Sequence, residues 1–207
     1  MMTVRSIGLL TCFCLLFSAL STAQSYAPGF APGLHVPGAT LGVPTAAGGL
    51  TFSEDGSTLY MAGNANTPSG AIYALAVIRD PVTRVITGFG PPSYFTAAPD
   101  NDGGLAFGPR GTLFYTTYPS NSLGQIVGAS TTVLPLPFDS ASTGGLVWVP
   151  GGTANPDSFY VSSYTNGSIW SVQVTDNFDG TYTPTTATLL LATGLQLEGM
   201  AYVPSGP

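Results

Sequence analysis

The sequence predicts an all-β fold built from repeated units. Glycine and proline are abundant, at 27 and 18 of 207 residues. Short runs of apolar and small residues alternate between turn-forming residues, which is typical of strands. One pattern also returns along the chain, opening at glycines that lie 55, 41 and 54 residues apart: Gly49, Gly104, Gly145 and Gly199. Four short strands at this period are typical of a β-propeller blade, so we expect about three complete blades and the first strand of a fourth.

The N-terminus carries the features of a secretory signal. Arg5 is followed by an apolar run over 7–20 and then by Ser21-Thr22-Ala23. This order of a basic residue, an apolar segment and small residues is what signal peptidase reads. The run is shorter than the roughly 20 residues that span a bilayer. We therefore expect residues 1–23 to be removed, and the protein to be secreted or displayed at the cell surface from Gln24 onwards.

Both cysteines, Cys12 and Cys14, lie inside the expected signal. The mature chain then has no thiol, which excludes cysteine nucleophiles, disulfides and cysteine-based zinc sites. The alternative is a lipoprotein acylated at Cys12. Thr11 is a poor small residue before an acylated cysteine, and the apolar run continues past it, so a cleaved signal is the preferred interpretation.

The charge of the chain limits its partners. Removal of Arg5 leaves three arginines against ten acidic residues, so the formal net charge moves from −6 to −7. A basic patch is impossible, and binding to nucleic acid lacks its main source of affinity. The chain contains no lysine, which excludes Schiff-base chemistry. His35 is the one histidine, and it has no carboxylate near it in the sequence.

Residues 24–47 form a Gly/Pro-rich segment before the repeats. Proline removes a backbone donor, so this stretch cannot be a central strand throughout. We expect an extended N-terminal arm. An alternative is that residues 33–43 supply an outer strand to a neighbouring unit.

The repeats divide residues 48–207 into units over 48–102, 103–143, 144–197 and a partial unit over 198–207. First strands are expected at the opening glycines. Second strands are expected at Thr58–Ala62, Leu113–Thr117 and Phe159–Ser163. Third strands are expected to open with Gly-x-Ile at Gly70, Gly124 and Gly167. Fourth strands are expected at Val82–Thr87, Thr132–Leu136 and Thr186–Ala192.

The last unit contains only its first strand, at 199–203. Propellers close with about 4–8 blades. We therefore expect that the sequence is a fragment of a longer protein. The alternative is a four-bladed ring that residues 24–47 complete together with this terminal strand.

Several stretches resemble known propeller families. The sequences GGLAFGPRGTLFYTT (103–117) and GSIWSVQVTD (167–176) resemble repeats of NHL-type and gluconolactonase-type propellers. The signal, the absence of lysine and LEGMAYVPSGP (197–207) resemble exported bacterial propellers of the PEP-CTERM class. The resemblance spans residues 48–207. Its matching residues are those of turns and core, so it bears on fold more than on function.

The gluconolactonase resemblance implies a divalent metal near the propeller channel. The matching positions are Asn101, Asp102 and Glu198, whose hard oxygen ligands suit Ca²⁺ or Mg²⁺. The chain departs from the pattern at two positions, where Thr143 and Ser163 replace an asparagine and the catalytic aspartate. Glu198 also follows the other motifs instead of preceding them. The alternative role of these Asp and Asn residues is to shape loop turns.

Two further groups of residues have competing interpretations. Asp176 to Gly180 has the spacing of a calcium loop, but Phe178 stands at a ligand position, so a hairpin turn is preferred. Six aromatic residues could stack on sugar rings or pack between blades, and packing is preferred. These residues are Tyr115, Tyr118, Trp148, Tyr160, Tyr164 and Trp170.

These observations predict an exported, non-catalytic β-propeller module that binds or scaffolds an extracellular ligand, such as a protein or a polysaccharide. No cofactor is required on this interpretation, and no transmembrane segment is expected in the mature chain. The first alternative is a Ca²⁺-dependent, lactonase-like hydrolase that uses Asn101 and Glu198. The second is a carbohydrate-binding propeller.

Overall fold

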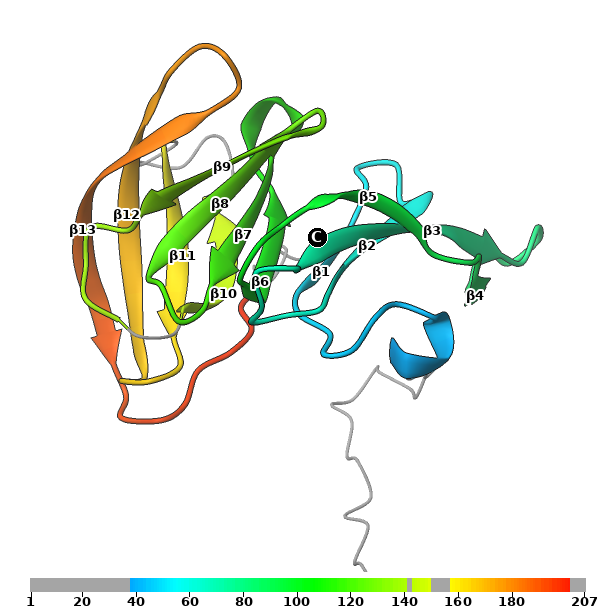
Figure 1. The fold of residues 1–207 in the computed structure, drawn as a ribbon, viewed down its shortest axis with the longest axis horizontal. Helices are drawn as coiled ribbons and strands as arrows, with labels where there is room; N and C mark the ends of the chain where they lie inside the picture. The colour runs from blue at the N-terminus through cyan, green and yellow to red at the C-terminus, as the bar shows by residue number, and fades with distance from the viewer. Residues whose placement is uncertain (1–37, 141–142, 150–156, 202–207) are drawn as a thin grey trace, which may run out of the picture. The chain divides into compact units, whose positions relative to one another are not determined.

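The structure is a computed structural model that describes residues 38–140, 143–149 and 157–201 (Figure 1). All of these residues belong to one compact unit over 34–207. The expected signal, His35 and the last residues of the partial fourth unit lie outside the described ranges.

The described residues form an all-β structure of antiparallel sheets, as the sequence predicts (Figure 1). The first sheet contains β1 (Leu50–Phe52), β2 (Thr58–Gly63), β3 (Ala71–Arg79), β4 (Ile86–Phe89) and β5 (Ser93–Ala97). The second contains β6 (Asn101–Phe107), β7 (Leu113–Thr117), β8 (Ser122–Val127) and β9 (Ser130–Pro135). The third contains β10 (Thr143–Trp148), β11 (Ser158–Ser163), β12 (Ser168–Asp176) and β13 (Tyr182–Ala192).

The only helical segments in the described ranges are two short 3₁₀ turns, η1 (Gly38–Leu41) and η2 (Pro109–Gly111). No described helix has the length and apolar character needed to cross a bilayer.

The fourth strand of the first sheet differs from its prediction at 82–87. The carboxylate of Asp80 accepts hydrogen bonds from the backbone N–H groups of Val82 (2.9 Å) and Thr83 (2.7 Å), so this stretch begins as a turn. Strand β4 starts only at Ile86, and β5 also pairs with β3. The Gly90 N–H donates to Ala76 O at 2.8 Å between them. Strands β4 and β5 therefore act as one outer strand that is interrupted after Phe89.

The expected start of the third strand at Gly124 is wrong in the second sheet. Ile72 lies opposite Ala62, and Ile169 lies opposite Ser162, but the residue opposite Thr116 is Leu123. Strand β8 therefore begins before Gly124.

Gly124 lies inside β8, opposite Tyr115. A Cβ atom on Gly124 would collide with the ring of Tyr115. The fully buried Tyr115 ring thus fills the space that a side chain at position 124 would take. This glycine makes room for an aromatic ring, and it does not mark a strand end.

The sheets pack face to face in chain order. Between the first and second sheets, Ala62 and Ile72 meet Leu105, Leu113 and Tyr115. The core between the second and third sheets is larger and more aromatic. It contains Phe114, Leu123, Leu146, Trp148, Phe159, Val161, Val172 and Tyr182. Each central sheet face is therefore buried by a neighbouring sheet, which is the largest source of stability in such a stack.

The far face of the first sheet is covered by the segment before β1. Leu41 and Val43 pack against Leu59, Met61 and Leu75. This segment contains η1 and does not pair as a strand. The alternative outer strand is therefore wrong for the described part of residues 33–43. The segment is a cover for the sheet.

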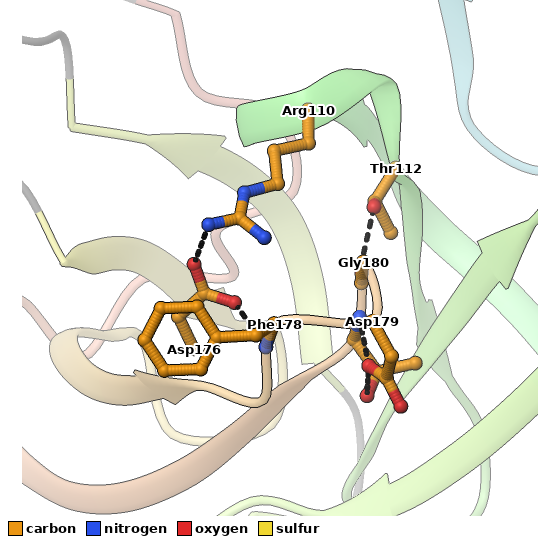
Figure 2. A network of polar contacts seen from close by, with 7 residues as sticks. Arg110, Thr112, Asp176, Phe178, Asp179 and Gly180 are labelled. Carbon is orange, nitrogen blue, oxygen red and sulfur yellow. Dashed lines mark hydrogen bonds and ion pairs between the residues drawn. The ribbon is translucent and has the colours of Figure 1, made fainter.

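Turns also join the second and third sheets (Figure 2). The Arg110 guanidinium lies 2.7 Å from the Asp176 carboxylate and 5.6 Å from the centre of the Phe178 ring. The hydroxyl of Thr112 donates to Gly180 O at 2.6 Å. Asp176 pairs with Tyr182, which confirms the predicted hairpin.

Candidate functional site

The inner strands of neighbouring sheets come close together at the glycines of the repeated pattern. A Cβ atom on Gly49 would lie 2.6 Å from Gly103 O, and one on Gly104 would lie 2.7 Å from Gly144 O. Such distances leave room only for glycine, which explains why the pattern repeats. A hollow of about 260 Å³, which we call the glycine hollow, is lined by Gly49, Gly103, Gly104, Gly145, Gly199 and Met200 among others.

Two buried hydroxyl groups connect neighbouring segments across this region. The Thr116 hydroxyl accepts from Gly104 N–H at 2.9 Å and donates to Gly144 O at 2.9 Å. The Ser162 hydroxyl accepts from Gly145 N–H and donates to Glu198 O, both at 2.7 Å. We call these two links the hydroxyl bridges.

The hydroxyl bridges were not expected from the sequence. In the first sheet, Ala62 stands at the matching position, and Gly49 N–H instead donates directly to Asp102 O at 2.9 Å. The available signal was the pair of hydroxyl residues that ends two of the second strands, Thr116-Thr117 and Ser162-Ser163.

The structure brings two of the three candidate metal ligands together. A Cβ atom on Gly103 would lie 2.9 Å from Glu198 Oε2, so this carboxylate lies over the inner strand of the second sheet. Partial loss of solvent raises the pKa of Glu198, and the negative charge of Asp102 raises it further. A bound cation would offset this repulsion between the two carboxylates.

Asn101, the third candidate ligand, is fully buried and has a structural role. Its Nδ2 donates to Ala98 O at 2.9 Å and to Gly63 O at 3.3 Å. Its Oδ1 is buried and has no hydrogen-bond partner. A Cβ atom on Gly48, which lines the glycine hollow, would lie 2.7 Å from this oxygen. The amide nitrogen of Asn101 therefore helps to hold the first two sheets together. Its amide oxygen has no hydrogen-bond partner among the described residues.

The residues fit a divalent cation in part. Two carboxylates and an unused amide oxygen are hard ligands of the kind Ca²⁺ prefers. However, within 38–140, 143–149 and 157–201 no three His, Cys, Asp or Glu side chains gather as a metal site. At the two positions that depart from the gluconolactonase pattern, the hydroxyls make structural contacts. Thr143 donates to Thr117 O at 3.1 Å, and Ser163 lies 2.6 Å from the Ser140 hydroxyl.

A second candidate site is the far face of the third sheet. A hollow of about 510 Å³ on this face is lined mainly by apolar residues: Val147, Tyr160, Ile169, Leu190, Leu191, Gly199, Met200 and Ala201. Leu190 and Leu191 are 51% and 49% exposed. We call this surface the open face.

The aromatic residues divide between core and surface. Tyr115 and Trp148 are buried, as the packing interpretation predicts. Trp170 stacks on Phe138 with ring centres 4.8 Å apart. Tyr118 is 41% exposed, and Tyr160 lines the open face.

No family model matches the chain, and no curated protein matches it. Among solved structures, it is similar to a candidate 6-phosphogluconolactonase from Bacteroides uniformis, at 17% identity and a TM-score of 0.39. The match covers 67% of this chain, which spans about half (55%) of the length of that structure.

Proposed function

We propose that the chain is part of an exported, non-catalytic β-propeller and serves as an extracellular binding or scaffolding module. The observation that carries this proposal is the open face of the third sheet. Large contiguous apolar surfaces on soluble proteins usually mark interaction sites.

The repeat itself supports this role for the open face. Tyr60 and Phe114 occupy matching positions on the second strands of the first two sheets. Phe107 of the next sheet packs against Tyr60 with ring centres 5.3 Å apart, and Trp148 packs against Phe114 at 4.8 Å. Tyr160 occupies the same position in the third sheet and lines the open face. The face is thus of the kind that receives another β-sheet.

The polar groups of the inner strands also suit a scaffold. The Thr116 bridge and the amide nitrogen of Asn101 make contacts between sheets, and the Ser162 bridge joins the third sheet to the segment at Glu198. These side chains hold the stack together.

Charged substitutions on the open face test the proposal. Leu191→Asp should abolish capture of the chain by an extracellular or cell-surface fraction from its source. Val82→Asp is the matched control, because Val82 is 85% exposed in a turn of the first sheet. Equal capture of both variants and the unaltered chain would contradict a binding role for this face.

A Ca²⁺-dependent, lactonase-like hydrolase is the second candidate, because Asp102 and Glu198 lie close enough to interact and Asn101 Oδ1 is unused. Thermal unfolding with Ca²⁺ and with EDTA distinguishes the two. A hundredfold excess of Ca²⁺ over its dissociation constant would stabilise the fold by about 2.7 kcal/mol. Glu198→Gln should remove that shift, whereas Glu54→Gln should keep it. An unfolding temperature indifferent to both reagents would reject the hydrolase.

A further inference from the structure

A second large hollow, of about 800 Å³, lies where the inner strands of the first two sheets end and turn. Strand β1 contributes Phe52, and the turn after it contributes Glu54. Strand β6 contributes Phe107, and the turn after it contributes Arg110. It shares no residue with the glycine hollow or the open face. We call it the Phe52–Phe107 hollow.

Two phenyl groups give this hollow an apolar lining. Phe52 is 39% exposed even though it lies in a strand. Phe107 is half-buried, and its ring is fixed edge-on against Tyr60 at an interplanar angle of 78°. An aromatic ring attracts a cation over its face and an apolar group over its whole surface.

The charges around the hollow leave one carboxylate unused. Arg110 is neutralised by Asp176 at 2.7 Å, outside the hollow's lining. Asp55 accepts hydrogen bonds from Ser53 and Ser57, which lower its pKa to about 2 and keep it ionised. Glu54, by contrast, makes no hydrogen bond or ion pair with any described residue. Of these two carboxylates, only Glu54 lines the hollow, and it is the free acceptor there.

We infer that the Phe52–Phe107 hollow binds an organic cation, an ammonium or guanidinium group carried on an apolar stem. The apolar stem packs against Phe52 and Phe107, and the cationic head pairs with Glu54. An anionic ligand is disfavoured, because the guanidinium of Arg110 is already paired with Asp176 and the carboxylate of Glu54 lines the hollow.

Calorimetric titration of the chain with three isosteric probes tests this inference. Phenethylammonium should bind. Raising the salt concentration should weaken this binding, because the contact with Glu54 is exposed to solvent. The neutral probe 2-phenylethanol should bind at least fivefold more weakly, and phenylacetate more weakly still. Equal binding of the charged and neutral probes would overturn the inference.

Variants assign the binding to this hollow. Glu54→Gln should weaken phenethylammonium at least fivefold. Asp139→Asn is the matched control, because it removes the same charge from another exposed site, and it should leave the affinity unchanged. Equal weakening by both variants would show that only the net charge matters, and no weakening by Glu54→Gln would reject the site. Phe52→Leu should also weaken binding while the unfolding temperature stays within a few degrees.

The same chemistry could come from a small amine or from a basic side chain of a protein. A short arginine-containing peptide and free agmatine distinguish these sources. Tighter binding of the peptide, lost in Glu54→Gln, indicates a protein partner. Equal binding of both indicates a small-molecule cation. Failure of every cation to bind would overturn the inference and leave the proposed role of the open face untouched.

Discussion

The two ends of the sheet stack differ in how their apolar faces are treated. On the first sheet, Leu59, Met61 and Leu75 are 4%, 5% and 0% exposed, because Leu41 and Val43 lie over them. On the open face of the third sheet, Leu190 and Leu191 of β13 remain 51% and 49% exposed. The sheets themselves are alike in strand order and direction. The difference comes from the segment that precedes β1, since a short proline- and glycine-containing stretch is enough to cover a sheet.

This comparison separates stability from recognition. Apolar area that is buried contributes to the free energy of folding at roughly 25 cal/mol per Å². Apolar area that stays exposed contributes little until a partner covers it. The covered end should therefore be sensitive to substitution in the isolated protein, and the open face should be sensitive in binding measurements.

The largest effect is expected at the covered end. Met61→Ala should lower the free energy of unfolding by about 2–5 kcal/mol, because a buried side chain is lost and a cavity remains. Urea denaturation measures the change. A loss below about 1 kcal/mol would mean that Leu41 and Val43 do not cover this face in solution.

The next effect concerns the hydroxyl bridges. Thr116→Ala should lower the free energy of unfolding by about 1–3 kcal/mol, because Gly104 N–H and Gly144 O lose a buried partner between two sheets. Ser162→Ala should cost less, since its acceptor Glu198 O belongs to the exposed end of the stack. Denaturant midpoints of the two variants compare them. A larger loss for Ser162→Ala would contradict the view that the open face is the weaker end.

A smaller effect is expected on the open face itself. Leu191→Ala should change the free energy of unfolding by less than about 1 kcal/mol, because the side chain is half exposed. Thermal unfolding of the unbound protein is the measurement. A loss as large as that of Met61→Ala would show that something already covers this face.

The smallest effect is expected at the turn after β1, and it depends on pH. The Ser53 hydroxyl and the Ser57 amide and hydroxyl lower the pKa of Asp55 from its ordinary value of 3.8 to about 2. A depressed carboxyl pKa stabilises the fold above the unfolded value, and this contribution is lost as the pH falls through the folded value. Asp55→Asn should therefore be slightly less stable than the unaltered chain at pH 7. The gap should close between about pH 4 and pH 2, and a gap that persists at pH 2 would reject this cause.

The repeated strands could be read from the sequence because each one is short, apolar and bounded by turns. The second strands begin and end within one residue of their predicted limits, as β7 does over Leu113–Thr117. The opening glycines were also informative, because close approach of inner strands admits no side chain. These features depend on local sequence and on one repeated contact.

The errors arose where the contacts of particular side chains, local or between strands, determine a residue's place in the fold. Gly124 looks like the start of a strand, but the ring of Tyr115 determines its position within β8. The outer strand of the first sheet was misplaced, because the Asp80 turn and the break after Phe89 split it in two. The contacts of Asn101 could not be read from its motif either, because the carbonyls of Gly63 and Ala98 occupy its amide nitrogen. Side-chain partners of this kind leave no periodic signal.

Deuterium exchange at two glycine amides of the inner strands reports how the stack of sheets opens. Gly49 N–H is bonded to Asp102 O in the next sheet, so its exchange with solvent deuterium requires the first two sheets to separate. Gly145 N–H is bonded to Ser162 in its own sheet and to Glu198 O in the segment beyond it. Exchange at these two amides thus reports two different opening events, one between the first two sheets and one between the third sheet and the segment at Glu198. A partner bound to the open face would slow deuterium exchange at Gly145 N–H and leave exchange at Gly49 N–H unchanged.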